Sequence, residues 1–344
     1  MISFIVTPLL QWYAQSRRDL PWRRDVTPYG VWVSEVMLQQ TRVSAVVQYY
    51  SRWMHALPDV AALAAASPTL VYKLWEGLGY YRRVSHMHEA ARIIMERYDG
   101  RIPSTVAELR SLPGVGEYMA GAIASIAYGV PEPAVDGNVL RVLSRLTGDD
   151  TDILTPAART RARELLRPVI PRDRASDFTQ AMFELGALVC TPTSPDCADC
   201  PLREGCYAWS HDLVAVLPVR VPRGHHATRD VTVLVLHTPA GYVLTLPRAV
   251  GLLAGTYGLP YAEADLAAED VPAACAEWGV RALSVRPLDA ARHVFSHVTW
   301  RMRGYWVECD VDRLPDACLV ATADEVRDRY AIPTAFAAYR GLLV

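Results

Sequence analysis

Four cysteines in one short stretch constrain the fold of this 344-residue chain more than any other feature. Cys190, Cys197, Cys200 and Cys206 stand in CTPTSPDCADCPLREGC with the spacing C-x6-C-x2-C-x5-C. The prolines in the stretch keep it out of a helix, so it must be a loop. Four thiolates closing on one centre suit an iron–sulfur cluster or zinc, whereas disulfides are rare in the cytoplasm. Structural zinc sites more often use two close pairs, so we expect a [4Fe–4S] cluster.

The length and composition indicate two globular domains. The chain is too long for one ordinary core, with 51% hydrophobic and 21% charged residues. No apolar run is long enough to span a bilayer. The N-terminus lacks the basic start and the cleavage site of a signal peptide. We therefore expect a cytoplasmic protein that does not associate with membranes.

Residues 1–210 carry the patterns of helices. Ser34 precedes an apolar-periodic run and is expected to cap it. Ser67 and Thr155 each precede a proline at the first position of a predicted helix. Thr105, or the serine before it, begins another helix with capping-box spacing. The first domain is therefore predicted to be all-α.

The pattern changes after about residue 210. Residues 211–229 are proline-bearing, polar and basic, which is typical of a linker. In 230–344, the runs VTVLVLHT and GYVLTLPR are joined by Pro-Ala-Gly and predict a hairpin, and RMRGYWVECDV predicts another strand. Ala264–Trp278 has the pattern of a helix. The predicted fold class is therefore an all-α domain followed by an α+β domain.

The charge balance gives no simple answer about partners. The net charge is −2, which is not the basic footprint of a nucleic-acid binder. Two arginine runs supply local positive charge, but each taken alone is better explained as a solvated helix face: Arg17, Arg18, Arg23 and Arg24, and then Arg159, Arg161, Arg163 and Arg167. Lys73 is the only lysine, so any chemistry that needs a side-chain amine must use it.

The stretch LPGVGEYMAGAI predicts a tight turn between two helices. One helix is expected to end at Leu112, and the next to begin near Tyr118. Gly114 and Gly116, on either side of Val115, allow the backbone to turn sharply and to approach a ligand closely. The N-terminus of the second helix offers free N–H groups, which can hold a phosphate without side-chain charge. An ordinary helix–helix turn is the alternative.

Several motifs together resemble one superfamily. LPGVG, the cysteine loop and AVDGNV (134–139) are similar to the helix–hairpin–helix DNA glycosylases. VWVSEVMLQQTRV (31–43) and GLGYY (77–81) narrow the resemblance to the adenine-DNA glycosylases of the MutY type. The resemblance implies a monomeric, nucleoid-associated enzyme that flips out and removes adenine mispaired with 8-oxoguanine or guanine in double-stranded DNA.

The residues carry the chemistry that this resemblance implies. Cleaving an N-glycosidic bond requires an acid for the leaving purine and a carboxylate for the oxocarbenium-like sugar. Glu35 lies in an apolar helix, where burial raises a carboxyl pKa. Asp136 lies in a Pro/Gly-flanked loop and is expected to stay ionised. By resemblance Glu35 acts on adenine N7, Asp136 faces the sugar, and Asn138 and Tyr118 support them.

Tyr118 also separates relatives, since lyase members of the superfamily place a lysine at this position for Schiff-base chemistry. We therefore expect a monofunctional glycosylase that leaves an abasic site.

Base flipping leaves a gap in the duplex that side chains must fill. Gln40 and Tyr80 match the family's intercalating positions, and Thr41 matches a contact to the opposite base. Four further residues match positions around the adenine pocket: Arg18, Trp22, Leu38 and Gln180.

The C-terminal part resembles the family's Nudix-like recognition domain in GLLAGTYGLP and FSHVTW. Phe295, Ser296 and His297 correspond to the loop that reads 8-oxoguanine. Tyr257-Gly258 departs from the aromatic–acidic pair of many relatives.

A Nudix hydrolase needs several glutamates to hold magnesium. Aligning the glycines of that motif puts other residues where Glu, Arg, Glu and Glu belong: Ala264, Pro272, Ala273 and Ala276. Only Glu277 remains, so we expect a binding module without hydrolase activity.

Two other functions fit parts of the sequence. A thymine-mismatch glycosylase of the same superfamily can also carry a tyrosine after the hairpin, but such relatives usually lack the domain with Phe295–His297. A non-catalytic iron–sulfur DNA-binding protein would not need Glu35 and Asp136.

Overall fold

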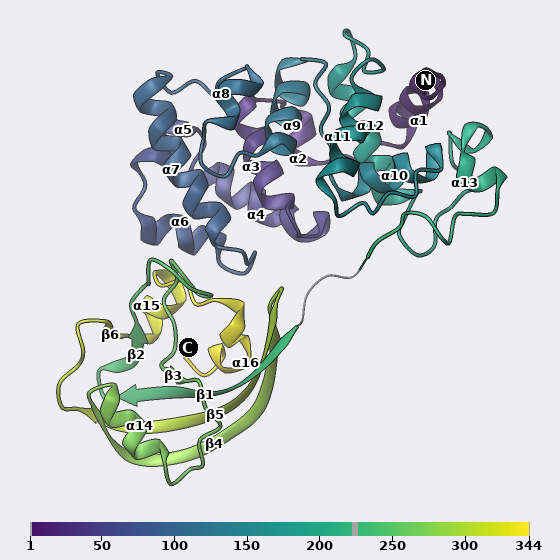
Figure 1. The fold of residues 1–344 in the computed structure, drawn as a ribbon. Coiled ribbons are helices and arrows are strands. Elements are labelled where there is room, and N and C mark those ends of the chain that lie inside the picture. The colour runs from purple at the N-terminus through teal and green to yellow at the C-terminus, as the bar shows by residue number, and fades with distance from the viewer. Residues whose placement is uncertain (1, 222–225, 344) are drawn as a thin grey trace. The chain divides into compact units, whose positions relative to one another are not determined.

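The computed structural model describes residues 2–221 and 226–343, and its contacts divide the chain into two compact units (Figure 1). The first comprises Met1–Ala64 and Glu89–Pro222, and the second comprises Ala65–His88 and Arg223–Val344. This division differs from the predicted boundaries chiefly in residues 65–88, which group with the C-terminal elements. Part of the predicted linker, residues 222–225, lies outside the described residues.

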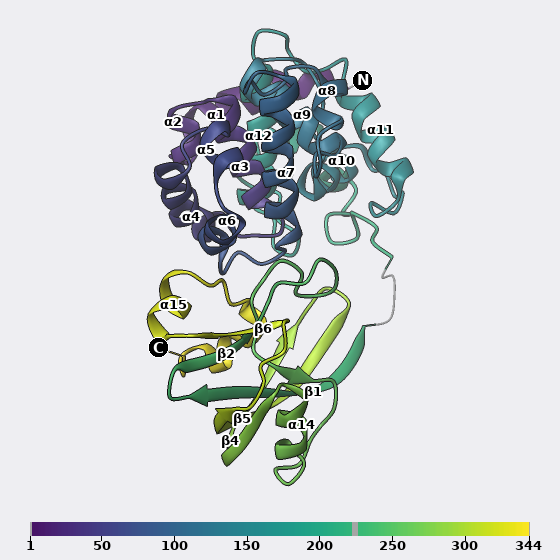
Figure 2. The same cartoon turned by 90° about the vertical axis from the view of Figure 1, so that its left-hand side faces the viewer.

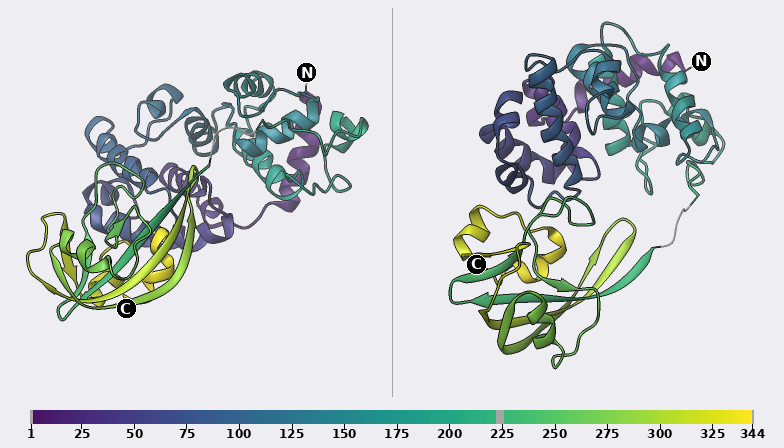
Figure 3. Two further views of the ribbon diagram at one scale, coloured as in Figure 1. Left: turned by 60° about the horizontal axis from the view of Figure 1, so that its bottom comes forward. Right: turned by 60° about the vertical axis from the view of Figure 1, so that its left-hand side comes forward.

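Helices predicted for residues 1–210 are found in the described residues up to Ser210 (Figure 1, Figure 3). The elements are η1 (Ser3–Ile5), α1 (Val6–Ser16), α2 (Pro21–Arg24), α3 (Pro28–Leu38), α4 (Val43–Ala56), α5 (Val60–Ala65), α6 (Pro68–Trp75), α7 (Arg82–Arg97), α8 (Val106–Arg110), α9 (Glu117–Tyr128), α10 (Gly137–Thr147), α11 (Pro156–Leu166), α12 (Ala175–Leu188), η2 (Arg203–Gly205) and α13 (Tyr207–Ser210). In the described part of the chain, every helix is too short or too polar to cross a membrane.

Three of the predicted helix starts are confirmed. The Ser67 hydroxyl accepts from the Leu70 amide at 3.2 Å, and the Thr155 hydroxyl accepts from the Ala158 amide at 3.2 Å. Thr105 caps the short helix α8. Each hydroxyl satisfies an amide that has no partner within its helix.

The prediction that Ser34 caps a helix is wrong. Thr27 caps α3 instead, and Ser34 is buried in the middle of that helix, where its hydroxyl donates to the Val31 carbonyl. The apolar run beyond Ser34 is also two helices, because the chain leaves the helical conformation at Gln40, whose φ is 57°. The break brings Gln40 to an exposed turn between α3 and α4.

The turn between α8 and α9 has the predicted form. Gly114 has a φ of 76°, a conformation that favours glycine. Gly116 is the N-cap residue of α9 and gives it no side-chain cap. A Cβ on Gly116 would meet nothing within 4 Å, so the space in front of the α9 N-terminus is open. Leu112 and Val115 are buried and fix the hairpin from beneath.

The C-terminal residues form one six-stranded sheet with helices on both faces (Figure 2). The elements are β1 (Ala227–Thr238), β2 (Gly241–Thr245), β3 (Tyr261–Ala262), α14 (Val271–Glu277), β4 (Val280–Val294), β5 (Val298–Val311), β6 (Cys318–Ala321), α15 (Ala323–Asp328), η3 (Thr334–Phe336) and α16 (Ala337–Arg340). The strand order is β4-β5-β1-β2-β6, with β3 paired to β1, and only the β1–β5 pair is parallel.

Successive side chains along β1 point to opposite faces of this sheet. Val233 and Val235 pack toward α15 and α16, and Leu234 and Leu236 pack toward α14. The hairpin predicted across Pro-Ala-Gly is confirmed by the antiparallel pairing of β1 and β2. The predicted strand RMRGYWVECDV is the greater part of β5.

Two parts of the C-terminal region differ from prediction. The helix expected at Ala264–Trp278 is limited to Val271–Glu277, because Pro272 marks a helix start rather than an interior. Strand β4, the longest of the described strands, was not predicted from the sequence. It is an edge strand with mostly exposed residues and carries Pro287, a residue that sheets tolerate at an edge.

Candidate active site

A small cavity in the helical unit brings together the residues predicted to bind and cleave the base. Its volume is about 180 Å³, which is on the scale of one nucleobase. The lining includes all four predicted pocket residues and four others with predicted chemical or DNA-contact roles: Arg18, Trp22, Leu38, Gln180, Glu35, Asp136, Asn138 and Tyr118. Thr41 lines it as well.

Glu35 lies on α3 and is 5% exposed. Its carboxyl pKa is raised to about 7, chiefly by burial and in smaller part by the nearby Asp136 charge. A hydrogen bond from the Tyr118 hydroxyl to Glu35 Oε2, 2.5 Å long, and the positive charge of Arg23 oppose that rise. A substantial fraction of Glu35 is therefore protonated near neutral pH, as a general acid requires.

Asp136 is the N-cap residue of α10, and its carboxylate is held at both oxygens. Oδ1 accepts from the Val139 amide at 2.7 Å, and Oδ2 accepts from the Asn138 side-chain amide at 2.9 Å. Burial raises the pKa of Asp136, whereas these hydrogen bonds and the Arg141 charge lower it. The raised pKa of Asp136 runs against the expectation that this carboxyl is ionised. The N-terminus of α10 and the hydrogen bonds favour the ionised form.

One wall of the cavity is a charged network that the sequence analysis missed. Glu184, on α12, is buried and accepts from Arg18 Nη2 at 2.7 Å and from Arg23 Nη2 at 3.0 Å. Burial raises the pKa of Glu184, but the arginine hydrogen bonds outweigh it and hold that pKa at about 2. Arg23 Nε also donates to Gln180 Oε1 at 3.1 Å.

Helix spacing could have revealed this network. Glu184 follows Gln180 by one helical turn in an apolar stretch, so the two side chains share a face. A lone carboxylate on such a face needs a cationic partner when it is buried.

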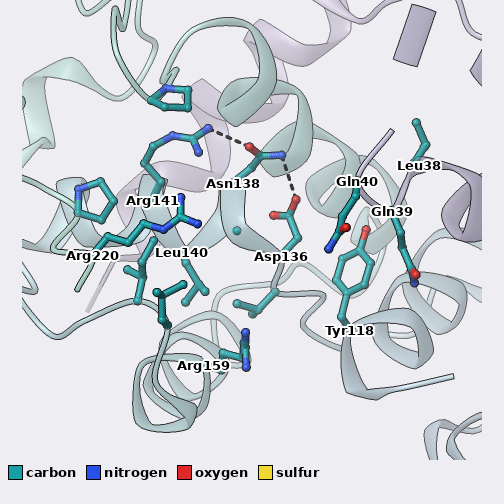
Figure 4. Close-up of a pocket in the computed structure, with 16 residues that line it drawn as sticks. Leu38, Gln39, Gln40, Tyr118, Asp136, Asn138, Leu140, Arg141, Arg159 and Arg220 are labelled. Atoms are coloured by element: carbon teal, nitrogen blue, oxygen red, sulfur yellow. Dashed lines mark hydrogen bonds between the residues drawn. The ribbon is translucent and has the colours of Figure 1, made fainter. Parts of the chain in front are cut away.

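A larger groove of about 890 Å³ opens beside this cavity (Figure 4). Leu38, Tyr118, Asp136 and Asn138 line both the cavity and the groove. Gln40 lines the groove but not the cavity. In Figure 4, Gln40 and Tyr118 lie on one side of Asp136 and Arg220 lies on the other. A base that enters the small cavity can therefore stay attached to a backbone in the groove.

Gln40 and Tyr80, the two predicted intercalating residues, share an uncommon backbone. Their φ angles are 57° and 50°, which are strained for residues other than glycine, and both are exposed. Such strain is found more often at functional sites than elsewhere. Within the C-terminal unit, the Tyr80 and Ser296 hydroxyls lie 3.3 Å apart.

Phe295, Ser296 and His297 form the tight turn between β4 and β5. The Phe295 amide donates to the Val298 carbonyl at 2.8 Å, which closes the turn. The Phe295 ring is half-buried against Trp300, with ring centroids 5.1 Å apart. Ser296 and His297 are exposed at the tip.

The four predicted cluster ligands line one irregular segment against the helical core. All seven cysteines have free thiols, and Cys190, Cys200 and Cys206 pack against that core. The four thiols are near enough to influence one another's charge. Across residues 2–221 and 226–343, no three His, Cys, Asp or Glu side chains gather closely enough to hold a single metal ion.

Arg145 fixes the path of this cysteine segment. It is buried and donates to the Thr191 carbonyl at 2.7 Å, to the Pro192 carbonyl at 3.1 Å and to Cys190 Sγ at 3.4 Å.

Comparisons with known proteins first define the class. Residues 33–168 match the model of the HhH-GPD superfamily of base excision DNA repair proteins. The helical part also resembles the structure of a thermostable thymine-DNA glycosylase, with a TM-score of 0.55 and 25% identity over 60% of this chain and 96% of that one.

Curated relatives then define the family. The adenine DNA glycosylase of Mycolicibacterium smegmatis is 45% identical over 203 residues, which cover 58% of this chain and 68% of the relative. That of Mus musculus is 47% identical over 210 residues, covering 58% and 41%. The chain belongs to the adenine DNA glycosylase family. It spans about two fifths of the length of the mouse relative.

Proposed function

We propose that the protein removes adenine mispaired with 8-oxoguanine or guanine in DNA by hydrolysing its N-glycosidic bond. The observation that carries the proposal is a buried carboxyl, Glu35, in a cavity the size of one base with a second carboxyl, Asp136, beside it. An acid for the purine and a carboxylate for the sugar are what the reaction needs.

Glu35 is the acid in this proposal. Its pKa of about 7 lets it carry a proton at neutral pH and give that proton to N7 of the bound adenine. The C1′–N9 electrons then leave with the neutral base. Tyr118, by donating to Glu35, fixes the orientation of the carboxyl group.

Asp136 faces the sugar as positive charge develops there. Asn138 and the Val139 amide hold its carboxylate in one orientation, so no reorganisation is needed as the charge forms. Water then completes the hydrolysis and leaves an abasic site.

The strand is left intact in this proposal because no lysine stands among the described residues that line the site. Tyr118 stands where lyase members of the superfamily carry lysine. Lys73 belongs to the second unit, where it pairs with Glu76 at 2.7 Å and donates to the carbonyls of Val326 and Tyr330. A monofunctional glycosylase follows.

Double-stranded DNA is bound through the hairpin and two wedges. The turn Leu112–Gly116 and the N-terminus of α9 that follows it hold a phosphate through backbone N–H groups. Gln40 and Tyr80 enter the duplex where the adenine leaves it, and Thr41 contacts the opposite base.

The C-terminal domain is a Nudix-like module that reads the opposite base. The exposed turn Phe295–His297 contacts 8-oxoguanine, and its proximity to Tyr80 supports that role. Alanines at 264, 273 and 276 stand where a Nudix hydrolase needs glutamates, so the module binds without hydrolysing. The domains in this proposal are 1–210 and 230–344, joined by 211–229.

The cysteine segment holds a [4Fe–4S] cluster in this proposal, and its donor set fits one. Four half-buried thiols are the ligands that such a cluster takes. Burial raises the pKa of the Cys200 thiol to about 11, so ligation must supply the free energy that keeps a thiolate there. When bound, the cluster cross-links the segment Cys190–Cys206.

Strand cleavage by alkali after base removal tests the proposal. Duplexes with A opposite 8-oxoguanine, A opposite guanine and T opposite guanine are offered to the wild type and to Glu35→Gln and Asp136→Asn. We expect cleavage at A in both mispairs, and its loss in both variants. Cleavage at T alone would favour a thymine glycosylase, and full activity of both variants would remove the acid and the carboxylate from the mechanism.

A second assay tests the monofunctional reaction. Borohydride traps an enzyme that forms a Schiff base with DNA. We expect no efficient trapping, and strong trapping would contradict the role assigned to Tyr118.

A further inference from the structure

We propose that Arg159 and Arg220 form a second phosphate-binding site, separate from the hairpin, for the DNA strand that carries the target adenine. The inference rests on the proposed function in taking DNA as the ligand. It begins from the groove beside Asp136, which both arginines line (Figure 4).

The α11 arginines differ in whether their charge is already used. Arg161 pairs with Asp149 at 3.1 Å, Arg167 pairs with Glu132 at 2.7 Å, and Arg163 pairs with Glu117. The Arg159 side chain makes no hydrogen bond or ion pair with any other residue of the described chain and is exposed. Three of these four arginines are therefore already paired with carboxylates. The fourth, Arg159, has a guanidinium that is free to bind an anion.

Arg220 reaches the same groove from the segment after α13. It is exposed and, within the described residues, likewise makes no ion pair or hydrogen bond. Its backbone is well anchored, because the Ile153 amide donates to the Val219 carbonyl at 3.1 Å and Arg145 Nε donates to the Leu217 carbonyl at 2.8 Å. Two open guanidinium groups are thus held on one groove by separate parts of the chain.

The groove's other charges leave this positive charge uncompensated. Arg141 also lines it, but its guanidinium donates to the Asn138 side chain and to the carbonyls of Gly186 and Cys190. Among the described lining residues, Asp136 is the only acidic one. A guanidinium binds phosphate through paired N–H donors, so the groove suits a phosphodiester backbone.

Position identifies the strand. The groove and the base cavity share Asp136, Asn138 and Tyr118, so the backbone that enters the groove belongs to the nucleotide whose base fills the cavity. A chain with a net charge of −2 needs such local cations to bind DNA. Arg159 and Arg220 supply them beside the reacting sugar.

Salt dependence of binding tests the site without measuring excision. The duplex carries an uncleavable 2′-fluorinated deoxyadenosine opposite 8-oxoguanine, and affinity is measured by fluorescence anisotropy across salt concentrations. Arg159→Ala and Arg220→Ala should each reduce the slope of log K against log[salt] by about one, because one phosphate contact accounts for roughly 0.9 of the slope. Arg159→Lys should keep most of the slope.

Arg161→Ala is the matched control, since it lies on the same helix and is neutralised by Asp149. We expect its slope to equal that of the wild type. An unchanged slope in both Arg159→Ala and Arg220→Ala, or an equal loss in Arg161→Ala, would overturn the site.

Neutral methylphosphonates then locate the contact. Placed one at a time beside the target adenosine, one of them should remove the effect of Arg159→Ala. Coupling confined to the opposite strand would contradict the proposal. Because excision is not measured, an inactive enzyme would leave these results interpretable, and an unchanged slope would leave the proposed activity intact.

Discussion

The base cavity and the β4–β5 turn use polar side chains in opposite ways. In the cavity, Glu35 and Glu184 are buried. Glu35 accepts a hydrogen bond from Tyr118, and Glu184 accepts hydrogen bonds from Arg18 and Arg23. At the turn, Ser296 and His297 are exposed, and the Ser296 hydroxyl lies 3.3 Å from the Tyr80 hydroxyl, which is also exposed. Under the proposed function, the groups that do the chemistry are buried and fixed before substrate arrives, whereas the groups proposed to read the opposite base are exposed to solvent.

The largest expected effect is on the excision rate, from replacing Glu35, the acid in the cavity. Glu35→Gln keeps the shape and removes the transferable proton, so we expect excision to fall by about 10³-fold, within the range of general acid catalysis. Single-turnover rates on an A:8-oxoguanine duplex measure it. Unchanged binding of an uncleavable duplex is the control, and a loss below tenfold would contradict the role of Glu35.

The next effect is on stability, from the charged wall of the cavity. Glu184→Gln leaves Arg18 and Arg23 without their shared carboxylate, and breaking a buried charged pair costs about 3 kcal/mol. Denaturant unfolding measures the change. Asp19→Asn, which breaks an exposed pair with Arg24, is the control and should leave the unfolding free energy unchanged within error.

The same carboxylate sets a pH window for stability. The pKa of Glu184 is held at about 2, below the usual 4.5. Its stabilisation is therefore present in full above pH 4.5 and is lost as the pH falls toward 2. In Glu184→Gln, this part of the acid sensitivity should disappear.

A smaller effect follows from the hydrogen bond between Tyr118 and Glu35. Wild-type excision should fall as the pH rises through about 7, because the acid form of Glu35 is lost. Tyr118→Phe removes a contact that lowers this pKa, so the alkaline limb should move upward by about one pH unit. Single-turnover rates from pH 6 to 9 measure it. A downward shift would mean that the hydroxyl stabilises the acid form instead.

How much of this could be predicted from sequence follows from what each feature depends on. The helix–hairpin–helix turn and the caps at Ser67 and Thr155 are local, and local residue types specify them. The prediction that Ser34 caps a helix was wrong because Thr27 had already begun that helix, and the Ser34 hydroxyl forms its hydrogen bond within it. Strand β4 was not predicted because it is an edge strand. Its long, mostly exposed sequence contains Pro287 and lacks a clear alternation of apolar and polar residues.

The site shows the same division. Motif resemblance placed Glu35, Asp136 and Tyr118 at one cavity, but Glu184 required knowing which arginines face it across the fold. The difference between Arg159 and Arg161 likewise depends on partners far away in sequence. Pairing of charges is a tertiary property, and a charge run alone does not reveal it.

The smallest expected effect sharpens the comparison at the turn. Ser296→Ala removes one hydroxyl that can bond the opposite base, and one neutral hydrogen bond contributes about 1 kcal/mol, or roughly fivefold. We expect excision of A opposite 8-oxoguanine to fall by that factor and excision opposite guanine to stay unchanged. Ser284→Ala, also exposed and on strand β4, which leads into this turn, is the matched control. Equal losses on both mispairs would mean that the turn holds DNA without distinguishing the oxidised base, and the contrast between a fixed catalytic cavity and an open reading turn would fail.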